Sequence, residues 1–198
     1  MKKTIIIFAL IVSTLVIASG QTTRGSLAFG GGFSYTVNKD SYDGDYTDTN
    51  LSFQPSAGYF ISDNLVAGVS LSINSSKEDY GSFNFTSKQF LVGPFIRYYK
   101  FTTNERFAFT GEAGFGVGSN TNKSSNGVET KGSSLSIYLA PGFSYFLTER
   151  WGFDFQFRGI TYSKTDPNKD TDNDEGTEFS FGLQSFSPSI GIRYYVNR

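Results

Sequence analysis

The sequence predicts an all-β protein: an eight-stranded antiparallel up-and-down transmembrane β-barrel, with short periplasmic turns and long extracellular loops. A repeated unit supports this fold, because a proline stands a few residues before an aromatic pair at four places in the chain. After each of the first three pairs, a polar turn leads into a strand in which apolar residues alternate with small or polar ones. The prolines are Pro55, Pro94, Pro141 and Pro188, and the pairs are Tyr59 and Phe60, Tyr98 and Tyr99, Tyr145 and Phe146, and Tyr194 and Tyr195.

Length and composition argue against several classes of protein. The 198 residues are enough for one domain. Because the chain has no Cys and no His, it lacks the groups for disulfides, for a His-based catalytic triad and for the usual zinc or copper sites. Its net charge of -1 provides no basic surface for nucleic acid. We therefore expect neither a cofactor nor a nucleic-acid partner.

Residues 1–20 have the pattern of a secretory signal peptide. Lys2 and Lys3 form the positive start, an apolar run covers 5–17, and the residues just before Gln21 form a small-x-small cleavage site. The run is shorter than the roughly 20 residues that a spanning helix needs. The expected organisation is a signal peptide at 1–20 and an outer membrane barrel at 21–198.

Period-two alternation gives each strand two different faces. In the first strand Leu27 and Phe29 share one face, and Ala28 lies on the other. Strands of this kind are expected at 26–37, 51–61, 65–73, 107–117, 134–145 and 151–158. The fourth and eighth strands, around 83–99 and 179–195, look like copies of each other, and in both the apolar phase slips. The slip predicts a β-bulge towards the long-loop end, and the four equivalent prolines suggest a shared kink or bulge.

Short turns and long polar segments alternate between these strands. The short turns are expected at 62–64, 102–106 and 148–150, and the long loops at 38–50, 75–86, 119–132 and 164–178. The long segments carry most of the acidic residues, so we expect acidic extracellular loops. The last one spaces Asp166, Asp170 and Asp174 somewhat like calcium ligands, but Glu175 stands where a calcium loop needs glycine. We therefore expect no metal site.

A soluble lipocalin-like binding barrel is the alternative architecture, and it places its apolar face inward. Its other face would meet water and should carry many charges. Here that face consists mostly of Gly, Ser, Ala and Thr, which suits the crowded interior of a narrow barrel. The face rich in Phe, Leu, Ile and Val suits lipid, so the membrane barrel is favoured.

A few polar and charged side chains fall on the inward face. Because buried charges need partners, they predict a polar network that plugs the lumen, and the alternative is an ion path. Arg97 and Glu112 flank one turn at similar distances and are expected to pair across it. The candidate network consists of Arg97, Glu112, Asp154, Gln156, Arg158 and Arg193.

The chain resembles the small outer membrane β-barrel family of Gram-negative bacteria, the OmpX/OmpA-transmembrane-like barrels. The block 93–99, the segment 145–151 and the closing strand carry the resemblance. It implies a place in the outer membrane beside lipid and lipopolysaccharide. It also implies contact with the barrel-assembly machinery, which reads a signal in the closing strand. The residues that fill this signal are Ser189, Gly191, Tyr194 and Val196.

The favoured function is structural: a largely plugged barrel that displays extracellular loops for interactions at the cell surface. A narrow channel for small solutes or ions remains the alternative within the membrane. An enzyme is not expected, because no His is available as a general base and the inward carboxylates Glu112 and Asp154 are equally consistent with lumen packing.

Overall fold

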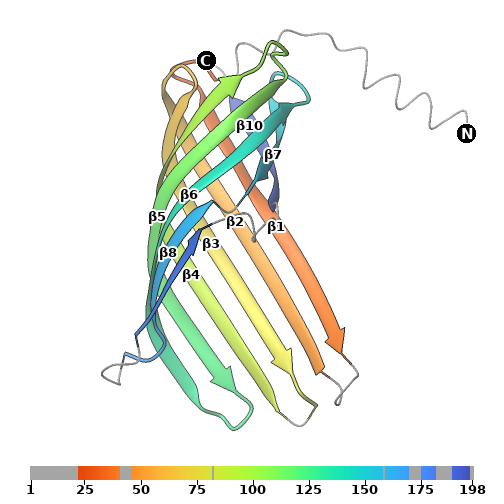
Figure 1. The fold of residues 1–198 in the computed structure, drawn as a ribbon, viewed down its shortest axis with the longest axis vertical. Coiled ribbons are helices and arrows are strands. Elements are labelled where there is room, and N and C mark those ends of the chain that lie inside the picture. The colour runs from red at the N-terminus through yellow and green to blue at the C-terminus, as the bar shows by residue number, and fades with distance from the viewer. Residues whose placement is uncertain are drawn as a thin grey trace, which may run out of the picture.

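The computed structural model describes residues 22–40, 46–81, 83–157, 159–169, 175–181 and 189–196, and all regular elements among them are strands (Figure 1). No helix in these ranges is long and apolar enough to cross a membrane. The strands are β1 (Leu27–Asp40), β2 (Tyr46–Ser62), β3 (Leu65–Asp79), β4 (Asn84–Phe101), β5 (Phe107–Ser124), β6 (Glu129–Phe146), β7 (Trp151–Gln156), β8 (Ile160–Asp166), β9 (Gly176–Phe181) and β10 (Ser189–Val196).

The strands form a closed eight-stranded antiparallel barrel, which confirms the predicted fold class. Each strand from β1 to β6 pairs with the next one along the chain, β6 pairs with β7, and β10 joins β7 to β1. The seventh strand of the barrel is divided into β7 and β8, and the described parts of the eighth strand are β9 and β10. Leu27 pairs with Val196, so the first strand begins and the last strand ends at the same end of the barrel, beside the short turns.

In the eighth strand, the described outer part β9 is less fully paired than β10, which has a partner on each side. β8 pairs with β6 and β9, but within the described ranges β9 pairs with β8 alone. Residues 33–40 of β1 likewise pair with β2 alone. Figure 1 shows β8 following the outer part of β6, away from the outer part of β1.

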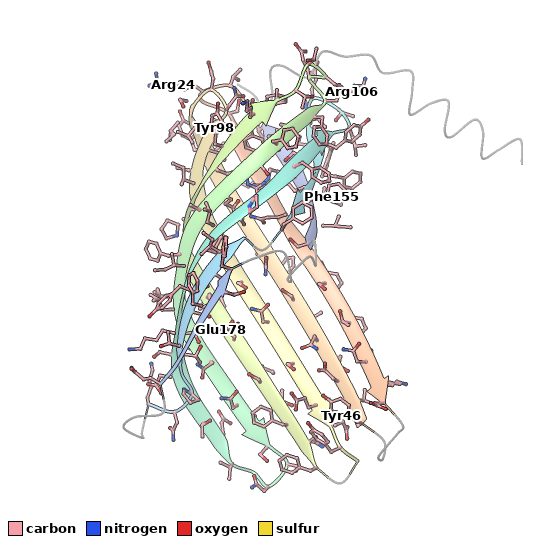
Figure 2. All side chains as sticks on the ribbon, in the orientation of Figure 1. Arg24, Tyr46, Tyr98, Arg106, Phe155 and Glu178 are labelled. Atoms are coloured by element: carbon pink, nitrogen blue, oxygen red, sulfur yellow. The ribbon has the colours of Figure 1, made fainter. Side chains whose placement is uncertain are left out.

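Most large apolar side chains lie outside the barrel, and most of the positions inside carry small, polar or charged side chains. Phe33 and Tyr35 of β1 are exposed on the outer surface, whereas Ala28 is buried within. Figure 2 shows Tyr98 near the short-turn end and Tyr46 near the opposite end. A lipocalin-like barrel requires the reverse orientation, so that alternative is wrong.

The expected short turns are confirmed, but the expected long loops are largely strand. Of the segments 38–50, 75–86 and 119–132, most residues belong to β1–β6, and the connections between these strands are short. Two of them use glycines with positive φ, Gly81 at 77° and Gly127 at 84°. Polarity misled the prediction, because backbone pairing continues along these segments although Asn, Lys, Asp and Glu are frequent in them. Residues 170–174 of the fourth segment lie outside the described residues.

The predicted bulge in the fourth strand is wrong, because β4 keeps one register against β3 from Tyr98 to Asn84. The corresponding part of the eighth strand, 182–188, lies outside the described residues. Pro55 and Pro94 also leave the register of their ladders unchanged. A change of register does occur beside Pro141, but it lies in the partner strand, where β7 ends and β8 begins. The prolines therefore do not mark a shared bulge.

Candidate functional site: the barrel interior

Four charged side chains from four strands meet inside the barrel. Arg97 of β4, Glu112 of β5, Asp154 of β7 and Arg193 of β10 are 4%, 7%, 7% and 3% exposed. Arg97 lies directly across from Glu112 in the ladder, and its Nε donates to Glu112 Oε2 at 2.6 Å. We call these four residues the charged layer. Two arginines and two carboxylates make it neutral as a whole.

Asp154 is the centre of the charged layer, because one of its oxygens accepts from both arginines. Arg97 Nη1 donates to Asp154 Oδ2 at 2.6 Å, and Arg193 Nε donates to the same oxygen at 2.8 Å. The other oxygen, Oδ1, accepts from Ser144 Oγ at 2.6 Å. Tyr138 donates its hydroxyl to Glu112 Oε1 at 2.9 Å. Both carboxylates are thus bonded through both of their oxygens, as burial requires.

Of the other two predicted members of this network, the structure describes the position of Gln156 but not that of Arg158. Gln156 lies on the inward phase of β7, two residues from Asp154 and across from Gly142 and Ser189. Arg158 lies outside the described residues.

A second layer, made of aromatic rings, lies next to the charged layer on the side of the short turns. Phe60, Tyr99, Phe146 and Tyr195 are fully or almost fully buried, and we call them the aromatic layer. Tyr99 and Tyr195 follow Arg97 and Arg193 by two positions in their strands, so they lie one step nearer the short turns. Neighbouring ring centroids are 5.3 to 6.4 Å apart, distances typical of packed aromatic pairs.

The four aromatic pairs of the sequence contain a signal for the aromatic layer. Its four members are the second residues of the four pairs. Adjacent strand residues point to opposite faces, so in each pair the first residue faces outward and the second inward. In β4, Tyr98 is exposed and Tyr99 is buried. The pairs therefore mark both the repeat and one inward aromatic position in each unit.

Beyond the charged layer, towards the outer end, the inner wall carries amide and hydroxyl groups. Ser52 donates to Asn74, Asn74 donates to Gln89, and both Gln89 and Asn120 donate to Ser134. We call these five residues the polar belt. It extends across β2 to β6 and contains no charge.

The predicted assembly signal lies on β10, where the barrel closes. Tyr194 packs on Trp151 with ring centroids 4.8 Å apart, and Val196 lies on the same outward phase. Gly191 lies so close to β1 that a Cβ at this position would come within 2.9 Å of the Gly31 carbonyl oxygen. Ser189 donates to the backbone carbonyl of Gln156 at 3.4 Å. A larger residue at 191 would therefore force the β1 backbone to shift where the barrel closes. This packing constraint on Gly191 holds whether or not the barrel-assembly machinery binds β10.

The geometry of the interior suits packing and charge pairing better than it suits metal binding. Among the described residues, no group of three or more His, Cys, Asp or Glu side chains could hold a metal ion. In the fourth outer connection, Asp166 Oδ1 accepts from the backbone N–H of Asn168 at 3.0 Å. The positions 170–174, which completed the calcium-like spacing, lie outside the described residues.

Comparison with known proteins gives a family and several solved barrels of low identity. Residues 6–184 match the family described as "Outer membrane protein beta-barrel domain". No curated protein matches the chain. The N-terminal β-barrel domain of Pseudomonas aeruginosa OprF is 14% identical, with TM-score 0.46 over 87% of this chain and 98% of that chain. Ail of Yersinia pestis is 16% identical, with TM-score 0.46 over 88% and 100%. Neisserial surface protein A is 13% identical, with TM-score 0.45 over 85% and 95%.

Proposed function

Because the chain belongs to the family of outer membrane protein β-barrel domains, we propose that it is a closed, non-conducting barrel of the outer membrane with a structural role. In this role the barrel holds the outer ends of its hairpins at the cell surface, where they contact partners. The observation that carries the proposal is the pair of layers stacked across the interior. Their contacts are side-chain hydrogen bonds and ring contacts, and they leave the charged groups buried.

The small number of strands supports a closed lumen. Eight strands enclose an interior that side chains can fill, unlike the wide channels of larger barrels. The charged layer joins β4, β5, β7 and β10 through hydrogen bonds. The aromatic layer then adds four rings from β2, β4, β6 and β10. A solute would have to separate both layers to pass.

The strand lengths support a role at the cell surface. β1 to β6 contain 14 to 18 residues, whereas about 9–11 tilted residues cross the hydrocarbon core. The additional residues extend the hairpins β1–β2, β3–β4 and β5–β6 beyond it. Their ends are ordered by contacts such as Asn50 to Asp48 at 2.8 Å and the ring pair Tyr46 and Tyr80 at 4.8 Å. Rigid hairpins of this kind can present side chains without loss of entropy on binding.

Conductance in a planar bilayer tests the closed lumen. The refolded wild-type protein should give no steady current. The double variant Phe60→Ala/Phe146→Ala, which thins the aromatic layer, should give brief openings. The double variant Tyr59→Ala/Tyr145→Ala removes the outward members of the same pairs and should stay silent. A steady current through the wild-type protein would favour the narrow channel instead.

Shortening the outer hairpins tests the surface role. A barrel whose β1–β2, β3–β4 and β5–β6 hairpins are cut back to tight turns should still fold and show heat-modifiable migration on gels. Cells that carry it should lose any surface-binding phenotype conferred by the intact protein at equal expression. Full retention of that phenotype would contradict the proposal that the outer hairpins contact partners at the cell surface.

We further assign to β10 the signal for the barrel-assembly machinery. The variant Tyr194→Ser/Val196→Ser should assemble poorly in cells and yet refold in detergent. The matched variant Tyr145→Ser/Leu147→Ser, in the segment with a similar pattern where β6 ends, should assemble at the wild-type level. Equal assembly of both variants would show that β10 has no special role.

A further inference from the structure

Lysines gather on the outer surface of the barrel, near the outer ends of β3 to β6. Lys77, Lys88, Lys123 and Lys131 all lie on the outward phase of their strands, one on each, and we call them the lysine patch. Nearer the short turns, the same faces of these strands carry apolar residues.

The strand registers place the four lysines in two adjacent rows. Lys88 lies across from Ser75 on one side and Thr121 on the other, and Thr121 lies across from Lys131. One step further out, Thr86 lies between Lys77 and Lys123. Diagonal neighbours on adjacent strands are about 7–8 Å apart. The patch is therefore compact enough for one anionic group to reach several ammonium groups.

The lysine patch begins where the apolar surface ends. The nearest outward row contains Ile73 and Phe90, which pair with each other and are both exposed, and it continues as Ser119 and Ser133 on β5 and β6. The next row towards the short turns is apolar throughout and consists of Leu71, Val92, Val117 and Leu135. Since lipid tails cover these rows, the lysines lie at the depth of the headgroups in the outer leaflet.

The patch carries more positive charge than its own carboxylates neutralise. Lys77 pairs with Asp79 at 3.5 Å, and Lys123 and Lys131 share Glu129 at 2.7 and 3.7 Å. No ion pair among the described residues involves Lys88. The side chains of Lys77, Lys123 and Lys131 are 54%, 57% and 75% exposed, so their ammonium groups can turn towards a ligand.

The described outward positions of β1 and β2 at this depth carry no positive charge. They are Tyr35 with Leu51 in one row and Val37 with Thr49 in the next. The lysine patch is therefore not continued from β3 onto β2 and β1.

We propose that the lysine patch binds the phosphate groups of a lipid A headgroup, so that one lipopolysaccharide molecule lies with its acyl chains against β3 to β6. The apolar rows contact the chains, and the ammonium groups contact the phosphates. Ser75, Thr86 and Thr121 supply hydroxyl groups between the lysines. This assignment does not depend on whether the lumen is closed.

Binding of diphosphoryl lipid A to the refolded protein in detergent micelles, at a fixed magnesium concentration, tests the proposal. The variant with all four patch lysines changed to Gln should bind at least about tenfold more weakly, because each lysine near an anionic surface contributes roughly 1 kcal/mol. The variant Lys39→Gln removes an outward lysine of β1 outside the patch and should bind as the wild type does. Changing all four patch lysines to Arg should preserve binding.

Two further comparisons separate the lipid from other sources of phosphate. Dephosphorylated lipid A should bind the wild type as weakly as diphosphoryl lipid A binds the Gln variant. Inorganic phosphate should not compete at millimolar concentration. Heat-modifiable migration verifies folding, and the double variant Lys88→Gln/Lys131→Gln replaces the quadruple one if the latter does not fold. Equal lipid A binding by folded wild-type and Gln variants, or effective competition by inorganic phosphate, would overturn the proposal.

Discussion

The two halves of the barrel are held together by different interactions. In the half with the short turns, the ladder closes through β7, β10 and β1, and the interior contains the charged layer and the aromatic layer. In the outer half, the described part of β9 pairs with β8 alone and the inner wall carries the uncharged polar belt. Packing inside the barrel thus stabilises one half, whereas backbone pairing between neighbouring strands accounts for the other. Single substitutions should therefore lower the free energy of unfolding strongly in the half with the short turns and only slightly in the outer half.

The largest effect is expected from Asp154→Ala, which leaves two buried arginines with one carboxylate. Breaking a buried ion pair by removing one partner costs about 3–5 kcal/mol. Urea unfolding, followed by the fluorescence of Trp151, would measure the loss. The matched change Asp48→Asn in the outer half should alter the free energy of unfolding by less than about 0.5 kcal/mol. Similar losses for both variants would remove the contrast between the halves.

A charge introduced on the outer surface tests where the lipid-covered part of the barrel ends. Leu71 faces outward in the apolar row of β3, so Leu71→Arg should cost roughly 2–4 kcal/mol if it lies near the midplane of the bilayer. Lys88→Leu, beyond the boundary, should change stability little. Refolding into lipid vesicles at several urea concentrations would compare the two variants. A small loss for Leu71→Arg would move the boundary towards the short turns.

The coupling of Arg97 and Glu112 should be intermediate in size. A double-mutant cycle with Arg97→Met and Glu112→Gln should give a coupling free energy of about 1–3 kcal/mol, because the two side chains share a buried hydrogen bond of 2.6 Å. Strictly additive losses would mean that Asp154 alone holds Arg97 in place. The pair Lys123 and Glu129, exposed at the outer end, should couple by less than about 1 kcal/mol.

The smallest effect is expected at the outer tips. Tyr80→Ala removes the ring contact with Tyr46, whose centroid lies 4.8 Å away. An aromatic pair contributes about 0.5–1.5 kcal/mol beyond its burial, and the exposure of Tyr80 to solvent reduces the effect. The midpoint of urea unfolding should therefore shift only slightly. A loss as large as that of Asp154→Ala would show that the outer half is packed as tightly as the inner one.

The sequence was sufficient wherever the environment alternates across a strand. Period two identified the strands around Leu27, Leu65 and Phe107 and their outward faces, because lipid and lumen select different side chains. It failed at segments such as 75–86 and 119–132, where both faces carry mostly polar side chains. There no apolar signal marks a strand, although backbone pairing continues.

Contacts within the interior were predictable between neighbouring strands and not between distant ones. The position of Arg97 and Glu112 relative to one short turn places them across from each other. The contact of Arg97 with Asp154, 57 residues away, depends on the diameter of the closed barrel and on how far each side chain reaches. A single sequence does not fix those quantities.

The charged layer has a consequence for how the barrel is completed. Glu112 lies across from Arg97 on the adjacent strand, so this pair is neutral even without the later strands. Asp154, the acceptor for Arg97 Nη1, comes from β7, and the second donor to Asp154, Arg193, comes from β10. A chain that lacks these two strands therefore leaves Arg97 Nη1 bonded to water instead of a carboxylate. Hydration of one guanidinium thus distinguishes an unfinished barrel from a complete one.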